Sequence, residues 1–401
     1  MPVTGPKKFN NIPFEYHKEL EIEIENITNL GSGIGRHDSW VIMVPNVAVG
    51  ERVRCRIFRN HSNYSEADLV EVLTPSPHRV KPLCPLFGIC GGCQYQHIDY
   101  DMQLKLKRQQ VKELLQKLAH VSVEVQSTVG MDQIYHYRSK LTPHFEKDAK
   151  NIGFLKLGNR FNIVDVEQCC IATRGINERL KTLRQEIRAK SFKKGGTLLL
   201  RDTGTEIVTD PTQIITQTIG DFKFQVYVGE FFQNNPHILK TFADYIIAEA
   251  SGDSISDLID AYCGVGVFGI YGHRKFQTIT GIEINERAID LARSNARINA
   301  VKNIQFIAGS AENIFSGKLP EARCAAIILD PPRKGCDALF LGQLATFSPK
   351  KIVYVSCSPD TQARDTKFLL EQGYRIDRVQ PFDLFPQTRH IENVMTFSNY
   401  R

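Results

Sequence analysis

Apolar and polar positions alternate along the first part of the chain. Leu20–Glu25 has a period of two, which is the pattern of a half-buried strand. Gly31-Ser-Gly-Ile-Gly reads as a turn between two such strands, and Pro75 and Pro77 end the region. Several short strands without a helix predict a small closed, OB-like β-barrel over residues 12–75. The strand-like runs are residues 20–25, 40–45, 51–57 and 67–73.

The pattern changes twice further along. Residues 100–118 place leucines near a spacing of 3.6 with a basic opposite face, which predicts a helix. From residue 231 onward, short continuous apolar runs alternate with helical segments such as 286–299, and such runs are typical of a parallel sheet covered on both faces. We therefore expect a multidomain α/β protein. Its parts are the barrel (12–75), a central α+β region (76–230), whose helix 100–119 could pack on the last domain, and a Rossmann-like domain (231–401).

Composition narrows the class of protein only moderately. Hydrophobic residues make up 42% of the 401 positions, which fits a globular protein and not a disordered one. The formal charge of +6 permits an anionic partner without requiring one. Residues 1–8 lack the apolar stretch of a secretory signal, and no apolar run is long enough to span a membrane. The expected location is the cytoplasm.

Three cysteines lie close together in the central region. Cys84, Cys90 and Cys93 fall within ten residues, and either Cys169 or Cys170 could supply a fourth thiolate. Zinc accepts four thiolates, but its sites usually show two short-spaced pairs. Three close cysteines and a distant one favour a cubane iron–sulfur cluster over zinc. A further alternative is that these are free, buried cysteines.

Acidic residues follow three consecutive strands of the predicted sheet. Asp260-Ala-Tyr-Cys-Gly-Val-Gly-Val-Phe links the first strand to a helix, and its glycines allow a nucleotide-like ligand to approach the backbone. This spacing favours S-adenosylmethionine over a nicotinamide dinucleotide. Glu283 ends the next strand, where it could accept ribose hydroxyls or simply cap a helix. Asp330, in Asp-Pro-Pro-Arg, lies at the same edge.

A cysteine follows the fourth strand. Cys357 precedes a helix, at the sheet edge where ligands bind, and helix N–H groups can lower the pKa of a thiol there. We interpret it as a nucleophile, against the alternative of a buried core cysteine. Asp383, His390 and Glu392 are candidate proton acceptors, and the residues alone do not choose among them.

In combination these motifs resemble the RNA uracil-C5 methyltransferase family, which makes 5-methyluridine. The resemblance spans nearly the whole chain, and residues 12–75 resemble a TRAM domain, an RNA-binding barrel. Two departures are Val267, where relatives often have a polar residue, and Ser358, where many have asparagine. The motifs that carry the resemblance are Phe232-Gln-Asn-Asn, Asp330-Pro-Pro-Arg, Ser356-Cys-Ser-Pro and Pro386-Gln-Thr-Arg-His-Ile-Glu.

The resemblance implies a role for each matching residue. Cys357 would be the nucleophile and Glu392 the base. Gln233, Tyr262, Glu283 and Asp330 would contact S-adenosylmethionine. Cys84, Cys90, Cys93 and Cys169 would hold a [4Fe-4S] cluster.

The resemblance also implies a partner. The layout of TRAM domain and cluster favours 23S ribosomal RNA over transfer RNA as substrate, with the chain acting as a monomer away from membranes. The target base must leave its stack before it can react. Two alternatives are a methyltransferase acting on the T loop of tRNA and a non-catalytic iron–sulfur RNA-binding factor.

Overall fold

The computed structural model describes residues 9–159, 161–309 and 320–399. The N-terminal residues 1–8, which carry the prediction about a secretory signal, lie outside the described part. The helices are α1 (Tyr100–Leu114), α2 (Arg174–Arg188), α3 (Pro236–Ala250), α4 (Val267–Tyr271), α5 (Glu286–Ile298), α6 (Ala338–Phe347) and α7 (Pro359–Glu371). The barrel strands are β1 (Glu19–Ile27), β2 (Ser32–His37), β3 (Trp40–Pro45), β4 (Arg52–Asn60) and β5 (Tyr64–Thr74).

The remaining strands fall into a central and a C-terminal group. The central strands are β6 (Lys140–Leu141), β7 (His144–Phe145), β8 (Ile152–Leu155), β9 (Ile163–Asp165), β10 (Gly196–Thr197), β11 (Leu200–Asp202), β12 (Ile207–Val208), β13 (Ile214–Ile219) and β14 (Phe222–Tyr227). The C-terminal strands are β15 (Asp257–Ala261), β16 (Thr278–Glu283), β17 (Ile304–Ala308), β18 (Ala325–Leu329), β19 (Lys351–Ser356), β20 (Tyr374–Phe382) and β21 (Glu392–Asn399).

The C-terminal strands form one seven-stranded sheet within the described residues, in the order β17-β16-β15-β18-β19-β21-β20. The first five strands in this order are parallel, as the continuous apolar runs predict. Strand β21 differs from that prediction, because it runs antiparallel to both of its neighbours, β19 and β20. The β20–β21 connection therefore reaches the same sheet edge as the carboxyl ends of the parallel strands.

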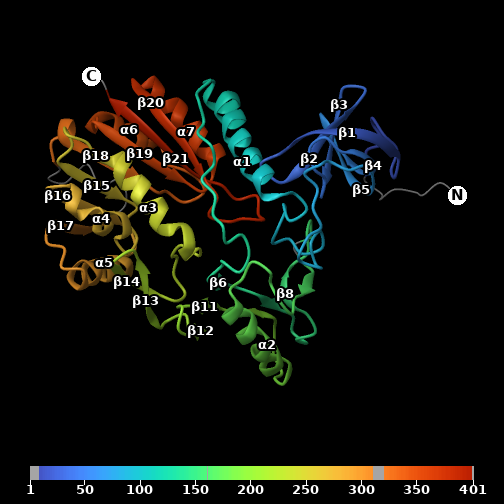
Figure 1. Ribbon diagram of the computed structural model, residues 1–401, viewed down its shortest axis with the longest axis horizontal. Coiled ribbons are helices and arrows are strands. Elements are labelled where there is room, and N and C mark those ends of the chain that lie inside the picture. Colours follow the sequence, from blue (N-terminus) through green and yellow to red (C-terminus); the bar gives the residue numbers. More distant parts are fainter. Residues whose placement is uncertain (1–8, 160, 310–319, 400–401) are drawn as a thin grey trace.

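Both faces of this sheet are buried, which explains why its strands read as continuous apolar runs. Leu258 and Ile279 pack with α3, α4 and α5, whereas Ile259 and Ile327 pack with α6 and α7. Helix α1 adds Val111 to the second core. Figure 1 shows α1 lying between the barrel and the C-terminal sheet.

The N-terminal barrel is closed in the order β1-β2-β3-β5-β4, as predicted, but one local prediction is wrong. The segment expected to be a turn at Gly31–Gly35 mostly belongs to strand β2. A Cβ atom on Gly33 would collide with Val47, and one on Gly35 would collide with the Glu23 carbonyl. These glycines therefore allow close packing inside the barrel rather than a reversal of the chain.

The central region consists of short strands around α2, and its core contains Leu141, Ile176 and Leu200. Strands β10 and β11 follow each other closely in the sequence but pair with different partners, β10 with β7 and β11 with β6 and β12. In the parts of the chain that the structure describes, none of the helices combines the length and apolar character needed to cross a lipid bilayer.

Candidate active site

Residues from separate parts of the sequence meet at one edge of the C-terminal sheet. In the parallel register, Ala261 at the end of β15 is level with Leu329 of β18, and Leu329 is level with Tyr354 of β19. Glu283 ends β16 beside β15. The residues that directly follow these strands, Tyr262, Asp330 and Cys357, therefore lie at the shared carboxyl edge, where ligands bind in open α/β sheets.

The antiparallel strand β21 brings Glu392 to Cys357. Ser356 pairs with Asn393, so the next positions along the two strands are Cys357 and Glu392. Glu392 is buried, and its charge acts directly on the Cys357 thiol. Two residues far apart in the sequence thus form a thiol–carboxyl pair at the sheet edge.

The surroundings of the Cys357 thiol oppose its ionisation. Burial, together with the nearby carboxylates of Glu392 and Asp330, raises its pKa to about 11. This corrects the expectation that the N-terminus of α7 would lower that pKa. Arg333 opposes the rise by hydrogen-bonding to the thiol. Sequence reasoning gave Arg333 no role, although it belongs to the Asp-Pro-Pro-Arg motif that points to this edge.

The structure distinguishes the three candidate proton acceptors. Asp383 is paired with Lys107 at 2.6 Å, and both side chains are fully buried. Burial and the surrounding cations Arg333, Arg389, Lys107 and Arg138 lower the pKa of His390 to about 4, so its ring is neutral at pH 7. Burial and Asp330 raise the pKa of Glu392 well above its usual range. Of the three, Glu392 is the acceptor whose charge acts on the cysteine.

Glu283 is held in place by backbone groups. One carboxylate oxygen accepts a hydrogen bond from the N–H of Gly264 at 3.2 Å, and the other accepts from the N–H of Asn285 at 2.9 Å. Asn285, rather than Glu283, caps helix α5. The helix-cap alternative for Glu283 is therefore wrong, and its carboxylate ties the glycine-rich loop to the end of β16.

Tyr262 adopts a left-handed backbone conformation, with φ of 65°, directly after β15. Its ring packs edge-to-face on Phe340 of α6, with centroids 5.7 Å apart, and its hydroxyl interacts with Cys336. A positive φ at a bulky residue is uncommon outside functional sites. The loop after β15 is thus held against α6 by this side chain.

Two buried carboxyl groups at this sheet edge have raised pKa values. Burial raises the pKa of both Asp260 and Asp330 to about 7. Asp260 accepts a 3.0 Å hydrogen bond from the N–H of Gly269, while its other oxygen has no partner among the described residues. Sequence reasoning missed Asp260 as a site residue, although its position at the head of the glycine-rich motif was available as a signal.

These carboxyls predict a pH-dependent affinity for a cationic donor. Below pH 7 Asp260 and Asp330 hold protons, and a sulfonium ion favours their ionised forms. The affinity for S-adenosylmethionine should therefore rise below pH 7, by up to about tenfold per pH unit for each carboxyl that must ionise, and level off near pH 8. Calorimetry from pH 5.5 to 8.5 measures this, with S-adenosylhomocysteine as the matched control without the sulfonium charge. Identical pH profiles for the two ligands would contradict the prediction.

Gln233 lies in the segment between β14 and α3, where it is partly buried. The neighbouring Asn235 donates a 2.7 Å hydrogen bond to the carbonyl of Leu384 and also caps α3. This contact ties the segment that carries Gln233 to the loop that precedes Glu392. A contact between Gln233 and a methyl donor stays a prediction.

The cysteine residues of the central region surround one cavity of about 200 Å³. Cys84 hydrogen-bonds to Cys170, while the Cys169 backbone is fixed by Asn177. Among the described residues, no group of three or more His, Cys, Asp or Glu side chains is placed to hold a single metal ion. The cysteines that line the cavity are Cys84, Cys90, Cys93, Cys169 and Cys170.

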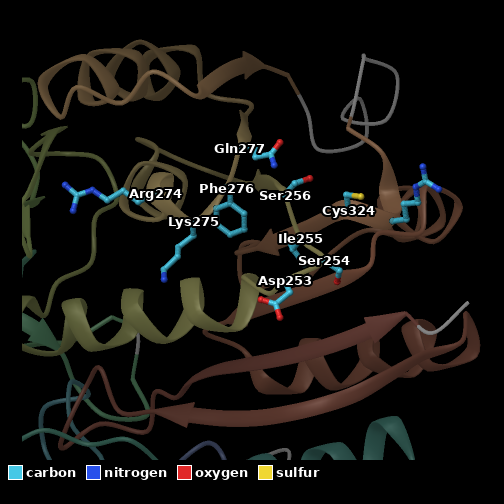
Figure 2. A pocket seen from close by; sticks show the side chains of 10 residues that line it. Asp253, Ser254, Ile255, Ser256, Arg274, Lys275, Phe276, Gln277 and Cys324 are labelled. Atoms are coloured by element: carbon cyan, nitrogen blue, oxygen red, sulfur yellow. The ribbon is translucent and has the colours of Figure 1, made fainter.

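Two larger cavities lie elsewhere. One of about 540 Å³ lies at the amino ends of β15, β16 and β18, opposite the candidate site, and Figure 2 shows Ser256, Phe276 and Cys324 around it. The other, of about 550 Å³, lies between the barrel and α1. Lys105, Arg108 and Lys112 line it, whereas Lys107 of the predicted basic face points inward to Asp383.

Comparisons with known proteins agree with this arrangement. Residues 197–399 match the family tRNA (uracil-5-)-methyltransferase, and residues 14–70 match the TRAM domain. A tRNA (uracil(54)-C(5))-methyltransferase of Schizosaccharomyces pombe is 38% identical over 97% of this chain and 80% of the relative. The same enzyme of Saccharomyces cerevisiae is 32% identical over 96% of this chain and 74% of the relative.

A solved structure has the same fold over most of its length. The tRNA (uracil-54, C5)-methyltransferase of Pyrococcus abyssi, in complex with S-adenosyl-L-homocysteine, is 27% identical with a TM-score of 0.72 and covers 94% of this chain and 100% of its own. The predicted fold class is confirmed. The chain belongs to the tRNA (uracil-5-)-methyltransferase family, and it is an S-adenosylmethionine-dependent RNA uracil-C5 methyltransferase.

Proposed function

We propose that this protein methylates C5 of a uridine in the T loop of tRNA. The relatives named above act on uracil 54 of tRNA, and this supports the alternative substrate better than 23S rRNA. The sequence-based preference for ribosomal RNA rested on domain layout alone and is not supported. The observation that carries the chemical part of the proposal is the placement of Cys357 opposite Glu392 at the sheet edge.

The proposed reaction gives each of the two residues one task. The Cys357 thiolate adds to C6 of uracil, which turns C5 into an enolate carbon that attacks the methyl group of S-adenosylmethionine, and the S–CH3 bond breaks to leave S-adenosylhomocysteine. Glu392 then takes the proton from C5, the C5–C6 double bond re-forms, and the C6–S bond breaks to release the thiolate. Arg333 and the positive charge of the donor favour the thiolate over the thiol, which opposes the high pKa of Cys357 in the free protein.

We propose that Gln233, Tyr262, Glu283 and Asp330 bind the donor. The positions of Glu283 and Asp330 beside the glycine-rich loop support this assignment. Asp260, which is buried at the start of the glycine-rich motif, would supply a negative charge that balances the sulfonium ion. The base must leave its stack to expose both C5 and C6, so the substrate is a flipped or single-stranded uridine.

RNA phosphates would follow the groove between the barrel and α1. Lys105, Arg108 and Lys112 are exposed there, next to the barrel residues Glu25 and Asn26. Clustered cations on one face are the electrostatic footprint of nucleic-acid binding. This groove would position the tRNA body while the T loop reaches the sheet edge.

The substrate proposal is tested by mapping methylated nucleotides by mass spectrometry. RNA from cells that lack this protein should have lost 5-methyluridine at tRNA position 54 and kept every methylated uridine in ribosomal RNA. Re-expression of the wild-type chain should restore the nucleotide, whereas the Cys357→Ala variant should not. Loss confined to 23S rRNA would overturn the choice of tRNA.

We further propose that Cys84, Cys90, Cys93 and Cys169 hold a [4Fe-4S] cluster. The shared cavity supports it, since a cubane is larger than a single ion and its four thiolates stand further apart. When bound, the group would link the 84–93 loop to the segment at Cys169. A zinc ion is the alternative, and metal and sulfide analysis distinguishes the two.

The cluster proposal predicts a stability effect. Cys84→Ser should lower the iron content and reduce the melting temperature by several degrees, because a cross-link between distant segments is lost. The control is Cys324→Ser, which changes a cysteine outside the cavity. Wild-type iron content and melting temperature in the Cys84→Ser protein would contradict the assignment.

A further inference from the structure

The loop between β20 and β21 carries Glu392 at its end and is held in an unusual backbone conformation. Residues 383–391 reverse the chain at the sheet edge, and all but three of their side chains are buried. Gln387, near the middle, has φ of +70°, the left-handed region that a residue with a Cβ rarely adopts. Such a conformation persists only where its surroundings enforce it.

Gln387 is held by residues that directly follow the 84–93 loop in the sequence. Its carbonyl accepts hydrogen bonds from the N–H groups of Gln94 and Tyr95, at 3.1 and 3.0 Å. Its own N–H donates to the side-chain oxygen of Gln103 at 3.0 Å. The amide nitrogen of Gln103 donates to the side-chain oxygen of Gln387 at 3.1 Å. The backbone N–H, the carbonyl and the side chain of Gln387 are therefore all bound.

Gln103 is itself held by side-chain hydrogen bonds to three other residues. It is fully buried in the first turn of α1, and its two amide N–H groups are shared among the side-chain oxygen of Gln387 and the carbonyls of Tyr95 and Ile98. One side chain thus joins the start of α1, the 95–98 segment and the loop between β20 and β21. A side chain with every polar atom satisfied in a buried network has a single favoured arrangement.

Neighbouring contacts hold the loop from the same side. Lys107, one turn further along α1, binds Asp383 at 2.6 Å, and the N–H of Arg389 donates to the side chain of Gln94 at 3.2 Å. The hydroxyl of Tyr137 donates to the carbonyl of Pro386 at 2.9 Å. The position of β21's first residue, Glu392, is therefore fixed by segments that precede the methyltransferase sheet in the sequence.

We propose that Gln103 is a positioning residue for Glu392: by holding Gln387 in the left-handed conformation, it sets the carboxylate at the distance required to take the C5 proton. The inference rests on the proposed function and assigns Gln103 to one step of it. Among the described residues, the side chain of Gln103 hydrogen-bonds to Tyr95, Ile98 and Gln387 and not to Cys357, so formation of the adduct and methyl transfer should not depend on it. Abstraction of the C5 proton by Glu392, in contrast, depends on Gln103.

The test separates these two steps in a single turnover. Full-length protein reacts with a tRNA transcript that carries tritium at uridine C5 and with S-adenosylmethionine labelled with carbon-14 in its methyl group. Gln103→Met keeps the size of the side chain and removes its hydrogen bonds. We expect near-normal methyl incorporation but tritium release slowed about tenfold or more, because small displacements of a reacting group carry losses of this size. A methylated RNA–protein adduct should accumulate.

The controls keep the result interpretable. Gln116→Met makes the same change at an exposed position just beyond α1 and should match the wild type. If Gln103→Met melts far below the wild type, Gln387→Met replaces it, since that variant keeps the main-chain contacts and removes the side-chain acceptor alone. Equal slowing of both labels, or no slowing of either, would overturn the positioning role. If the wild type incorporated no label into tRNA, the proposed function itself would fail.

Discussion

The Cys357→Ala protein should bind S-adenosylmethionine as the wild type does and release no measurable tritium from 5-tritiated uridine in RNA. We expect the rate to fall by more than about 10⁴-fold, because the thiolate is the group that makes C5 reactive. Donor affinity measured by calorimetry and tritium release measured on tRNA transcripts provide the two readouts.

A second cysteine supplies the matched control for this prediction. Cys324 lies at the opposite edge of the same sheet and lines the cavity in Figure 2. Cys324→Ala should therefore leave tritium release within about twofold of the wild type, as is usual for changes away from the reacting groups. Undiminished release by Cys357→Ala would reject the assignment of the nucleophile.

The second large effect is expected at Glu392. Glu392→Gln keeps the shape of the side chain but cannot accept the C5 proton, so turnover should fall by about 10²–10⁴-fold. Methyl transfer precedes the blocked step, and the variant should therefore accumulate methylated RNA bound covalently to Cys357. Denaturing gels with labelled donor would show this species as a band of increased mass.

The control for Glu392→Gln is Glu371→Gln, an exposed carboxylate at the end of α7. It should turn over like the wild type and retain no covalent RNA. If Glu392→Gln lost activity without an adduct, Glu392 would act before methyl transfer, and another group would take the C5 proton. His390 is the next candidate, since its ring is neutral and lies near Arg333.

Local patterns were enough to predict most of the sheet edge. Continuous apolar runs indicated strands buried on both faces, and the residue after each strand then had to lie at the shared carboxyl edge. Glu283, Asp330 and Cys357 were found in this way. The strand β21 could not be placed by the same argument, because an antiparallel strand added to a parallel sheet is set by tertiary pairing. The facing of Glu392 and Cys357 is visible only in the register of β19 and β21.

Electrostatic expectations were less reliable than positional ones. A helix N-terminus was expected to lower the pKa of Cys357, but burial and two carboxylates outweigh it. Lys107 belongs to the predicted basic face of the 100–118 helix but is instead buried against Asp383. In both cases the deciding neighbour comes from a distant part of the chain, so periodicity and spacing carry no information about it.

The central claim of this account is a transient bond between the Cys357 sulfur and C6 of a uridine. A tRNA transcript containing 5-fluorouridine tests it most directly, because fluorine at C5 cannot be removed as a proton and elimination stops after methyl transfer. With S-adenosylmethionine present, the wild type should form a complex with RNA that survives denaturing electrophoresis, and Cys357→Ala should form none. Absence of the complex with active wild-type protein would contradict the account.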